Sequence, residues 1–358
     1  MTPTIPLTAR TAITTGFDQE YVIKDDHPVK QPSELNPGEC LVKLDYTGVC
    51  HSDIHVGRGE WAWKAPLPLI GGHEGVGHVV AIGEHSEAGS VKVGDRVGVK
   101  WIGRICMSCE MCRKGHESCC PISRTHSHGY RIPGTFSQYV VSYVNYVTHI
   151  PDELDSAAAA PLLCAGLTIY RALKEANLGV GDWVSISGAG GGLGHLGVQY
   201  AVAMGLRVLA IDTGEAKKEL CLKLGAEKWV DFQKSEDLTA DVQAATGGSG
   251  PQAAVIAAGV PKPFNQALMY LRETGTLVCV GMPGGGAMIN APVNLLIAKK
   301  LNIVGSSLGN RQDVIEALQL AAQGKVKCQY EVKEFSELQS VLKDLDEGKI
   351  TGRVVLRL

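Results

Sequence analysis

The spacing of hydrophobic and polar residues changes near the middle of the chain. From about residue 38 to residue 150, the apolar positions form short runs that Gly, Pro and Asp interrupt, and helical periodicity is scarce. This pattern predicts an antiparallel β domain. The predicted strands are 40–46, 75–82, 95–100 and 137–141.

From about residue 181, apolar strands alternate with helix-like segments, which predicts a parallel sheet covered on both faces. Six such strands are typical of a doubly wound dinucleotide-binding fold. The tail from residue 313 adds two amphipathic segments and a last strand over 353–358, which we expect to return to the first domain. The predicted strands are 183–187, 207–212, 228–232, 253–259, 275–281 and 302–306, and the helices are 193–204, 215–224 and 262–272.

Composition narrows the class of protein. The 358 residues favour two domains. A net charge of −3 with well-mixed signs argues against a nucleic-acid partner or a polybasic membrane face. Segment 183–206 carries no Asp, Glu, Lys or Arg, but glycines interrupt it, so we expect no membrane span. The first residues lack a signal-peptide pattern, and an odd count of 11 cysteines argues against a disulfide framework. We therefore expect a cytoplasmic protein whose thiols serve metal binding or catalysis.

A glycine-rich turn follows the strand predicted over 183–187. Unpaired amides at a helix start favour a pyrophosphate, and glycines let it approach the backbone. Asp212 ends the next strand, where a carboxylate can bind ribose hydroxyls and repel a 2′-phosphate, so NAD is favoured over NADP. With Gly191 and Gly194 as the second and third glycines, Ala189 takes the first position and Gly188 precedes it, so the motif alone is weak. A flexible loop is the plainer alternative.

Four cysteines lie within fifteen residues, in a C-x2-C-x2-C-x7-C pattern. Four thiolates this close can surround one Zn²⁺ and pin a loop, which indicates a closed structural site. An iron–sulfur site is the alternative, but the last gap differs from the ferredoxin spacing and no second cluster follows. Cys119 could replace the last ligand. The four cysteines are Cys106, Cys109, Cys112 and Cys120.

A second ligand set is scattered along the chain. Cys50, His73 and Cys164 supply two thiolates and one imidazole, the ligands of a catalytic zinc with an open fourth position. Each residue alone is a weak indication, since His73 could be a buried structural histidine and Cys164 plain core.

These motifs together carry a family resemblance. They are Cys50-His-Ser-Asp, Gly71-Gly-His-Glu-Gly, the Cys106–Cys120 cluster, Leu162-Leu-Cys-Ala-Gly, the glycine turn and Val280-Gly-Met-Pro. In this order, from about Tyr46 to Arg353, the chain resembles the zinc-dependent medium-chain alcohol dehydrogenases, most closely the yeast and fungal type. The resemblance implies a GroES-like antiparallel β catalytic domain over 1–162, a Rossmann NAD-binding domain over 163–306, and a return to the catalytic domain over 307–358.

The resemblance also implies an activity. Two zinc ions per subunit are expected, one catalytic and one structural, with hydride passing between short primary alcohols such as ethanol and NAD. Ser52 and His55 would relay the alcohol's proton to solvent, and Asp53 would orient the ligand histidine. Glu74 is similar to a carboxylate that approaches the metal during ligand exchange. A homotetramer is expected.

The remaining implied residues bind the cofactor or line the substrate pocket. His51 and Arg353 resemble groups that meet the pyrophosphate, and Lys217 the residue beside the adenosine ribose. Trp61, Trp101 and Met282 are similar to a pocket that favours short primary alcohols. Any of them could instead be solvated charge or aromatic core. The implied cofactor-binding residues are His51, Gly188, Gly191, Gly192, Leu193, Gly194, Asp212, Lys217, Val280, Met282 and Arg353.

Three rival functions stay open at this point. The same fold could act on secondary alcohols, polyols or larger aromatic aldehydes, which the two tryptophans disfavour. A zinc-free quinone reductase is opposed by the complete ligand set, and a zinc-scaffolded binding module needs neither an open metal site nor Asp212. Preferred chain length, physiological direction and the role of Cys119 are not predicted.

Overall fold

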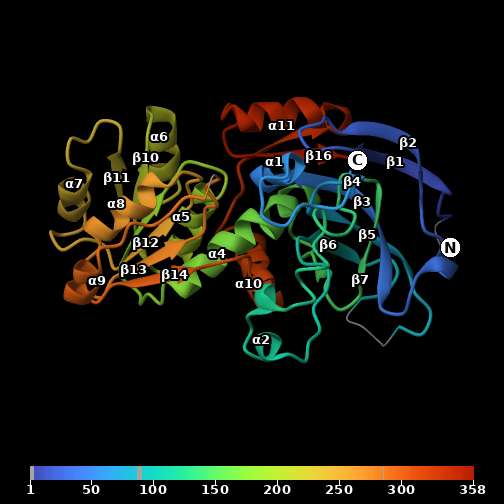
Figure 1. Cartoon of the computed structure of the whole chain (residues 1–358), viewed down its shortest axis with the longest axis horizontal. Coiled ribbons are helices and arrows are strands. Elements are labelled where there is room, and N and C mark those ends of the chain that lie inside the picture. The colour runs from blue at the N-terminus through green and yellow to red at the C-terminus, as the bar shows by residue number, and fades with distance from the viewer. Residues whose placement is uncertain (1–3, 87–90, 285) are drawn as a thin grey trace. The chain divides into compact units, whose positions relative to one another are not determined.

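The computed structural model describes residues 4–86, 91–284 and 286–358 and separates into two compact units (Figure 1). The first unit comprises Met1–Cys164, Gly309–Gln319 and Tyr330–Leu358, and the second comprises Ala165–Leu308 and Leu320–Gln329.

The first unit is built on a mainly antiparallel sheet in the order β15-β16-β3-β5-β6-β8, with β7 paired to β3, and a smaller sheet β2-β1-β4. Its strands are β1 (Thr8–Thr14), β2 (Val22–Pro28), β3 (Glu39–Val49), β4 (Leu69–Ile70), β5 (Glu74–Ile82), β6 (Arg96–Lys100), β7 (Tyr139–Tyr143), β8 (Thr148–His149), β15 (Tyr330–Glu334) and β16 (Arg353–Arg357). Its helices are α1 (His51–Arg58), α2 (Glu110–Arg113), α3 (Ser156–Ala159) and α11 (Leu338–Asp346), with short 3-10 turns at Pro32–Glu34, Glu117–Cys119, Ala160–Leu163 and Phe335–Glu337.

This arrangement confirms the predicted antiparallel β domain and the return of the last strand to it. β16 pairs antiparallel with β3, so that Val354 lies opposite Val49. Apolar side chains of β3, β5 and β6 form a buried core, because a pleated strand directs every second side chain inward. Strand β2 was not predicted, because its side chains are largely exposed and its sequence has little apolar alternation.

The second unit is a six-stranded parallel sheet in the order β11-β10-β9-β12-β13-β14. Its strands are β9 (Trp183–Ser187), β10 (Arg207–Asp212), β11 (Lys228–Asp231), β12 (Ala253–Ile256), β13 (Thr276–Cys279) and β14 (Asn302–Gly305). Its helices are α4 (Ala165–Glu175), α5 (Gly194–Ala203), α6 (Glu215–Lys223), α7 (Leu238–Ala245), α8 (Lys262–Tyr270) and α9 (Val293–Lys299), while α10 (Arg311–Ala322) begins in the first unit and ends in the second.

The strand order reverses direction between β9 and β12, as in the doubly wound fold, and helices lie along the sheet (Figure 1). Residues of β9 and β12 are fully buried or nearly so, which explains the continuous apolar runs in the sequence. The Rossmann prediction is confirmed.

The predicted tail 307–358 is not a single piece of the first unit, because Leu320–Gln329 packs with the second. Gln199 of α5 exchanges two hydrogen bonds with the backbone of Lys327, at 3.0 and 2.8 Å. The ring of His195 accepts the amide of Gln329 at 3.1 Å. These contacts are polar and join residues far apart in sequence, so the pattern of hydrophobic residues could not predict them.

Across the described ranges, no single helix is long and apolar enough to cross a membrane. One bent pair, Ser156–Leu163 with Ala165–Glu175, meets that length and composition only when its two parts are joined across a 48° bend.

Candidate metal centres and cofactor turn

The predicted open metal site is assembled inside the first unit. The ligand atoms of Cys50, His73, Glu74 and Cys164 all lie within 4.8 Å of one another, and the four residues are buried. They come from the start of α1, the segment before β5, the start of β5 and the end of a 3-10 turn. Residues 114 positions apart thus meet at one point, which the sequence pattern alone does not require.

Asp53 fixes the orientation of two of these ligands. Its Oδ1 accepts a hydrogen bond from Nδ1 of His73 at 3.0 Å, and its Oδ2 accepts the backbone N–H of Cys50 at 2.9 Å. A carboxylate can only accept, so Nδ1 carries the hydrogen and Nε2 of His73 keeps its lone pair. Among the residues that the structure describes, that buried Nε2 has no hydrogen-bond partner. A buried nitrogen lone pair facing two thiols fits a zinc ion, because zinc takes sulfur and imidazole ligands.

Burial and neighbouring groups shift the pKa values of the residues in this site in different directions. The contact with Cys164, together with His73, holds the pKa of Cys50 well below its usual range, while the same contact and burial raise the pKa of Cys164. Burial raises the pKa of Glu74 to about 7, against the opposing effect of Arg353. Low thiol pKa values favour the thiolate form that binds metals.

Glu74 and Arg353 form a buried ion pair between β5 and β16. The guanidinium of Arg353 contacts Oε1 of Glu74, while the buried Oε2 of Glu74 has no partner in the part of the chain that the structure describes. A side chain at Gly48 would place a Cβ only 2.0 Å from that Oε2, so only glycine leaves room for the carboxylate there. Arg353, predicted from the resemblance as a pyrophosphate contact, is thus occupied by Glu74 in this structure.

The predicted relay and pocket residues of the first unit lie around the same ligands. His51, Ser52 and His55 are on α1, directly after Cys50. Trp101 packs edge-on against His73, with ring centroids 4.9 Å apart, and Trp61 packs edge-on against Trp101 at 5.5 Å.

Sequence reasoning missed a third aromatic residue of this cluster. The ring of Tyr130 stacks on Trp101 at 5.5 Å and meets Trp61 edge-on at 5.2 Å. Its hydroxyl donates to the backbone carbonyl of Trp63. Tyr130 lies in an irregular loop with no periodicity, so only its aromatic character marked it.

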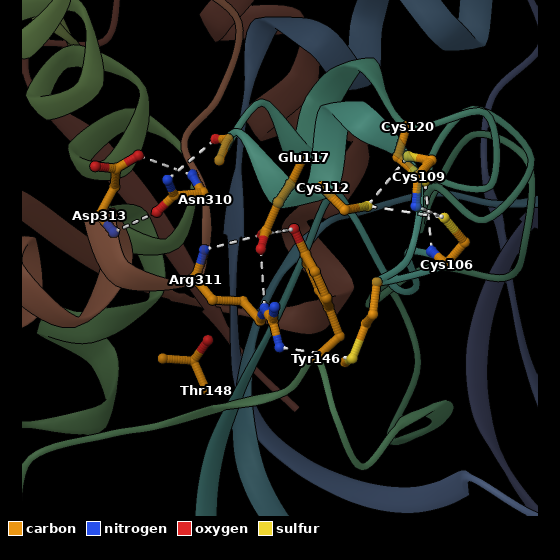
Figure 2. Close-up of polar contacts among 12 residues, drawn as sticks. Cys106, Cys109, Cys112, Glu117, Cys120, Tyr146, Thr148, Asn310, Arg311 and Asp313 are labelled. Atoms are coloured by element: carbon orange, nitrogen blue, oxygen red, sulfur yellow. Dashed lines mark hydrogen bonds and ion pairs between the residues drawn. The ribbon is translucent and has the colours of Figure 1, made fainter.

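The four-cysteine cluster also forms (Figure 2). Backbone N–H groups of Cys106 and Cys109 point at the sulfurs of Cys120 and Cys106, at 3.4 and 3.3 Å, and the thiols of Cys109 and Cys112 lie 3.5 Å apart. Such N–H contacts favour thiolates, and those from Cys109 and Ser108 lower the pKa of Cys106 to about 6. The fourth sulfur of this group is that of Cys120, and Cys119 is exposed and outside it.

A buried carboxylate that sequence reasoning missed anchors the cysteine loop, and no local pattern marked it. Glu117 accepts the hydroxyl of Tyr146 at 2.9 Å and both the backbone N–H and the side-chain Nε of Arg311 at 3.0 Å (Figure 2). Asn310 adds a hydrogen bond to the carbonyl of Gly115 at 3.1 Å. Asn310, directly before α10, and Arg311, its first residue, therefore hold the cysteine loop in place.

The glycine turn of the second unit has the geometry of a phosphate-binding turn. Gly188 has a φ of +79°, a backbone conformation that favours glycine. A Cβ on Gly194 would lie 2.0 Å from the carbonyl oxygen of Gly188, so α5 packs closely on the end of β9. Gly192 and Leu193 complete the entry to α5. This turn presents the amino end of a helix beside a tight bend, as pyrophosphate binding requires.

Asp212 ends β10 beside this turn. Its Oδ2 accepts the N–H of Gly190 at 3.0 Å and its Oδ1 accepts the Nζ of Lys217 at 2.9 Å. The predicted residues Asp212 and Lys217 therefore meet. Val280, just after β13, is buried, and the side chain of Met282 is 58% exposed.

A zinc-site oxidoreductase with a dinucleotide-binding unit is the class that this fold and these sites define. Residues 36–152 match the family described as alcohol dehydrogenase GroES-like domain, and residues 192–323 match the family described as zinc-binding dehydrogenase. The chain is 46% identical over 339 residues to an alcohol dehydrogenase of Schizosaccharomyces pombe, covering 95% of this chain and 94% of that protein. It belongs to the zinc-type medium-chain alcohol dehydrogenases, of the fungal type.

Solved structures agree with that family. An alcohol dehydrogenase from Aeropyrum pernix superposes with a TM-score of 0.86 at 30% identity, covering 98% of this chain and all of that one. An acetophenone reductase from Geotrichum candidum, solved in complex with NAD, superposes with a TM-score of 0.84 at 28% identity, covering 99% of each chain.

Proposed function

We propose that this alcohol dehydrogenase interconverts short primary alcohols, ethanol among them, with their aldehydes, and that NAD is its cofactor. The observation that carries the proposal is the Nε2 of buried His73, which lies close to the thiols of Cys50 and Cys164 and has no hydrogen-bond partner within the described ranges. Two thiolates and one imidazole leave a fourth position for substrate.

The first-unit residues then have distinct roles. A zinc ion held by Cys50, His73 and Cys164 supplies Lewis-acid chemistry that makes a bound alcohol's hydroxyl more acidic. Asp53 keeps the ring of His73 in the tautomer that binds metal. Ser52 and His55 carry the alcohol's proton toward solvent, while Arg353 is paired with the buried carboxylate of Glu74.

The aromatic cluster supports the preference for small substrates. Trp61 and Trp101 lie within 5.5 Å of each other, and Trp101 touches the ligand His73. Large rigid rings beside the ligands leave little room for branched or bulky alcohols and exclude water.

The proposed cofactor is NAD, which supplies the hydride acceptor. The glycine turn offers amides to its pyrophosphate, and the carboxylate of Asp212 accepts ribose hydroxyls and repels a 2′-phosphate. Lys217 is held by Asp212 at the same edge. A second zinc, bound by the four cysteines, is proposed to be structural, because four sulfur ligands leave no open position.

A homotetramer is part of the proposal. Apolar side chains are exposed on α9 and on the edge strand β14, with Val293 69%, Ile297 72% and Ile303 41% exposed. Exposed apolar groups next to an unpaired strand edge favour association between copies. Light scattering of the purified protein tests the state directly.

The test combines metal analysis with NADH formation from ethanol, butanol, propan-2-ol and benzyl alcohol. We expect two zinc ions per chain and faster turnover of ethanol and butanol than of the other two. Faster turnover of propan-2-ol would favour a secondary-alcohol enzyme instead. A single zinc per chain, or no turnover of any alcohol, contradicts the proposal.

A matched pair of cysteine variants ties activity to the open site. Cys164→Ala should lose one zinc per chain and, by analogy with removal of an essential ligand, at least about 100-fold in kcat. Cys279→Ala changes a half-buried cysteine outside both ligand sets and should keep both metals and full activity. Equal zinc contents in the two variants would remove Cys164 from the site.

A further inference from the structure

The chain reverses direction directly after α1, and this turn brings Glu60 next to His55. Gly59 has a φ of +64°. The N–H of Gly59 donates to the carbonyl of Val56 at 3.0 Å, and the N–H of Glu60 donates to the carbonyl of His55 at 3.1 Å. These two bonds form a Schellman cap, which fixes where the first residue after Gly59 lies.

Glu60 and His55 are linked a second time, through their side chains. Oε2 of Glu60 lies 2.5 Å from Nδ1 of His55. A carboxylate oxygen accepts hydrogen bonds and donates none, so Nδ1 carries the hydrogen. The other ring nitrogen, Nε2, is therefore the one that keeps its lone pair.

The ring of His55 is also held from its face. Trp61 stacks on it with centroids 6.3 Å apart and an angle of 26° between planes. Trp61 is in turn fixed by Trp101 and Tyr130 in the aromatic cluster. One carboxylate and one indole thus define both the direction and the plane of the imidazole.

The other charged groups near this pair act mainly through Arg58. Its NH1 is 3.7 Å from Oε1 of Glu60, and its two terminal nitrogens bind Asp346 of α11 at 2.9 and 2.6 Å. Asp18 lies 3.9 Å from Nε of Arg58. His51 and Asp346 act on the pair through longer-range electrostatics. Arg58 therefore pairs with the oxygen of Glu60 that does not contact His55.

We propose that Glu60 is a positioning residue that holds His55 in the Nδ1–H tautomer and leaves Nε2 free to accept the proton released by the alcohol. This inference rests on the proposed alcohol dehydrogenase function. The proton released by the substrate hydroxyl would pass by way of Ser52 to Nε2 of His55, and the imidazolium would then release a proton to water. The His55 side chain is 24% exposed, which gives that last transfer access to solvent.

The tautomer is measured on the full-length protein by long-range ¹H–¹⁵N correlation after ¹⁵N-histidine labelling, with His55 assigned from His55→Gln. At a pH where the ring is neutral, we expect the Nδ1–H form in the wild type. Glu60→Ala should shift the ring to the Nε2–H form, while Glu60→Gln, whose amide oxygen still accepts, should largely keep Nδ1–H. An Nε2–H ring in the wild type, or no change in Glu60→Ala, overturns the proposal.

Kinetics provides the second readout. Glu60→Ala should lower kcat for ethanol oxidation about 10-fold, the lower end for loss of a group that orients a functional histidine, with zinc content and the KM for NAD unchanged. Added imidazole buffer should restore most of the rate, because an external base replaces the misdirected ring. A loss that imidazole leaves untouched indicates a purely structural effect and contradicts the proposal.

Two controls separate this inference from the function on which it rests. Asp45 and His78 form a similar exposed carboxylate–histidine pair at 3.1 Å, and Asp45→Asn should leave turnover unchanged. If His55→Ala turns over ethanol at the wild-type rate, the relay itself is wrong. If His55→Ala is slow and Glu60→Ala is not, only the role of Glu60 fails.

Discussion

Lys100 is a basic side chain buried away from water. It is buried at the end of β6, where its Nζ contacts the carbonyl of Tyr146, donates to the hydroxyl of Thr148 at 2.9 Å, and lies 4.2 Å from the Tyr146 ring centre. Burial lowers the pKa of Lys100 to about 7, against the attraction of Glu117 and with the repulsion of Arg311. The folded state therefore releases a proton that the unfolded chain keeps.

This shift predicts how stability depends on pH. Between about pH 7 and pH 10 the unfolded chain binds more protons at Lys100, so the free energy of unfolding should rise with pH, by at most about 1.4 kcal/mol per pH unit from this group. Lys100→Met should remove that component of the slope. Denaturant unfolding at pH 6, 7, 8 and 9 measures both proteins, and parallel profiles would rule the effect out.

The sequence allows a site residue to be predicted where its residue type and spacing are rare. Closely spaced cysteines have few explanations other than a metal, and the structure brings all four sulfurs of that cluster together. Glu60, Glu117 and Tyr130 are common residue types in irregular segments. Glu60 is placed by a helix cap, Glu117 contacts the start of α10, and Tyr130 contacts a loop 67 residues away. No local sequence pattern could reveal these contacts.

At the scale of elements, the junction of β9 and α5 depends on close backbone approach. A Cβ at position 194 would lie 2.0 Å from one carbonyl oxygen and 2.6 Å from the Cα of Ala189, and these are backbone atoms that cannot rotate away. The helix must therefore shift to admit any side chain.

Gly194→Ala should for this reason weaken cofactor binding more than it weakens the fold. We expect the Kd for NADH, measured by fluorescence titration, to rise at least about 10-fold, and the free energy of unfolding to fall by about 1–3 kcal/mol, as for an overpacked site. Gly179→Ala is the control, because its nearest neighbour would be 3.6 Å away. Unchanged NADH affinity in Gly194→Ala would separate the turn from the cofactor site.

The elements of the second unit were the most predictable part of the fold. Its strands are buried on both faces and read as apolar runs, and the helices between them are long enough to show periodicity. Helix α9 has no buried side chain and followed no such pattern, and the exposed strand β2 was missed for a similar reason. A helix or strand can be predicted from sequence when its side chains pack into the core, because burial requires a regular pattern of apolar residues.

At the scale of the whole molecule, Glu117 joins three segments that are distant in sequence. The cysteine loop, Tyr146 before β8 and Arg311 at the start of α10 all meet its carboxylate (Figure 2). Arg311 is partly exposed, so its ion pair is screened, while Glu117 and Tyr146 are buried.

Glu117→Gln should lower the free energy of unfolding by about 1.5–3 kcal/mol, the usual value for a hydrogen bond to a charged group. Zinc in the four-cysteine site should also exchange faster with a chelator, because the loop loses its anchor. Glu110→Gln alters an exposed carboxylate on the same loop, which pairs with the exposed Lys114, and should change neither quantity. Equal melting temperatures for Glu117→Gln and the wild type would show that the anchor contributes nothing.

The distance along the chain between the cysteine loop and its anchor also affects how the protein is made. Cys120 leaves the ribosome about 190 residues before Arg311, which at roughly 5–20 residues per second is a delay on the order of ten to forty seconds. During that interval the cysteine loop lacks its hydrogen bonds to Asn310 and Arg311. Metal capture by the nascent loop would then be the first step in its protection, and docking of α10 the last.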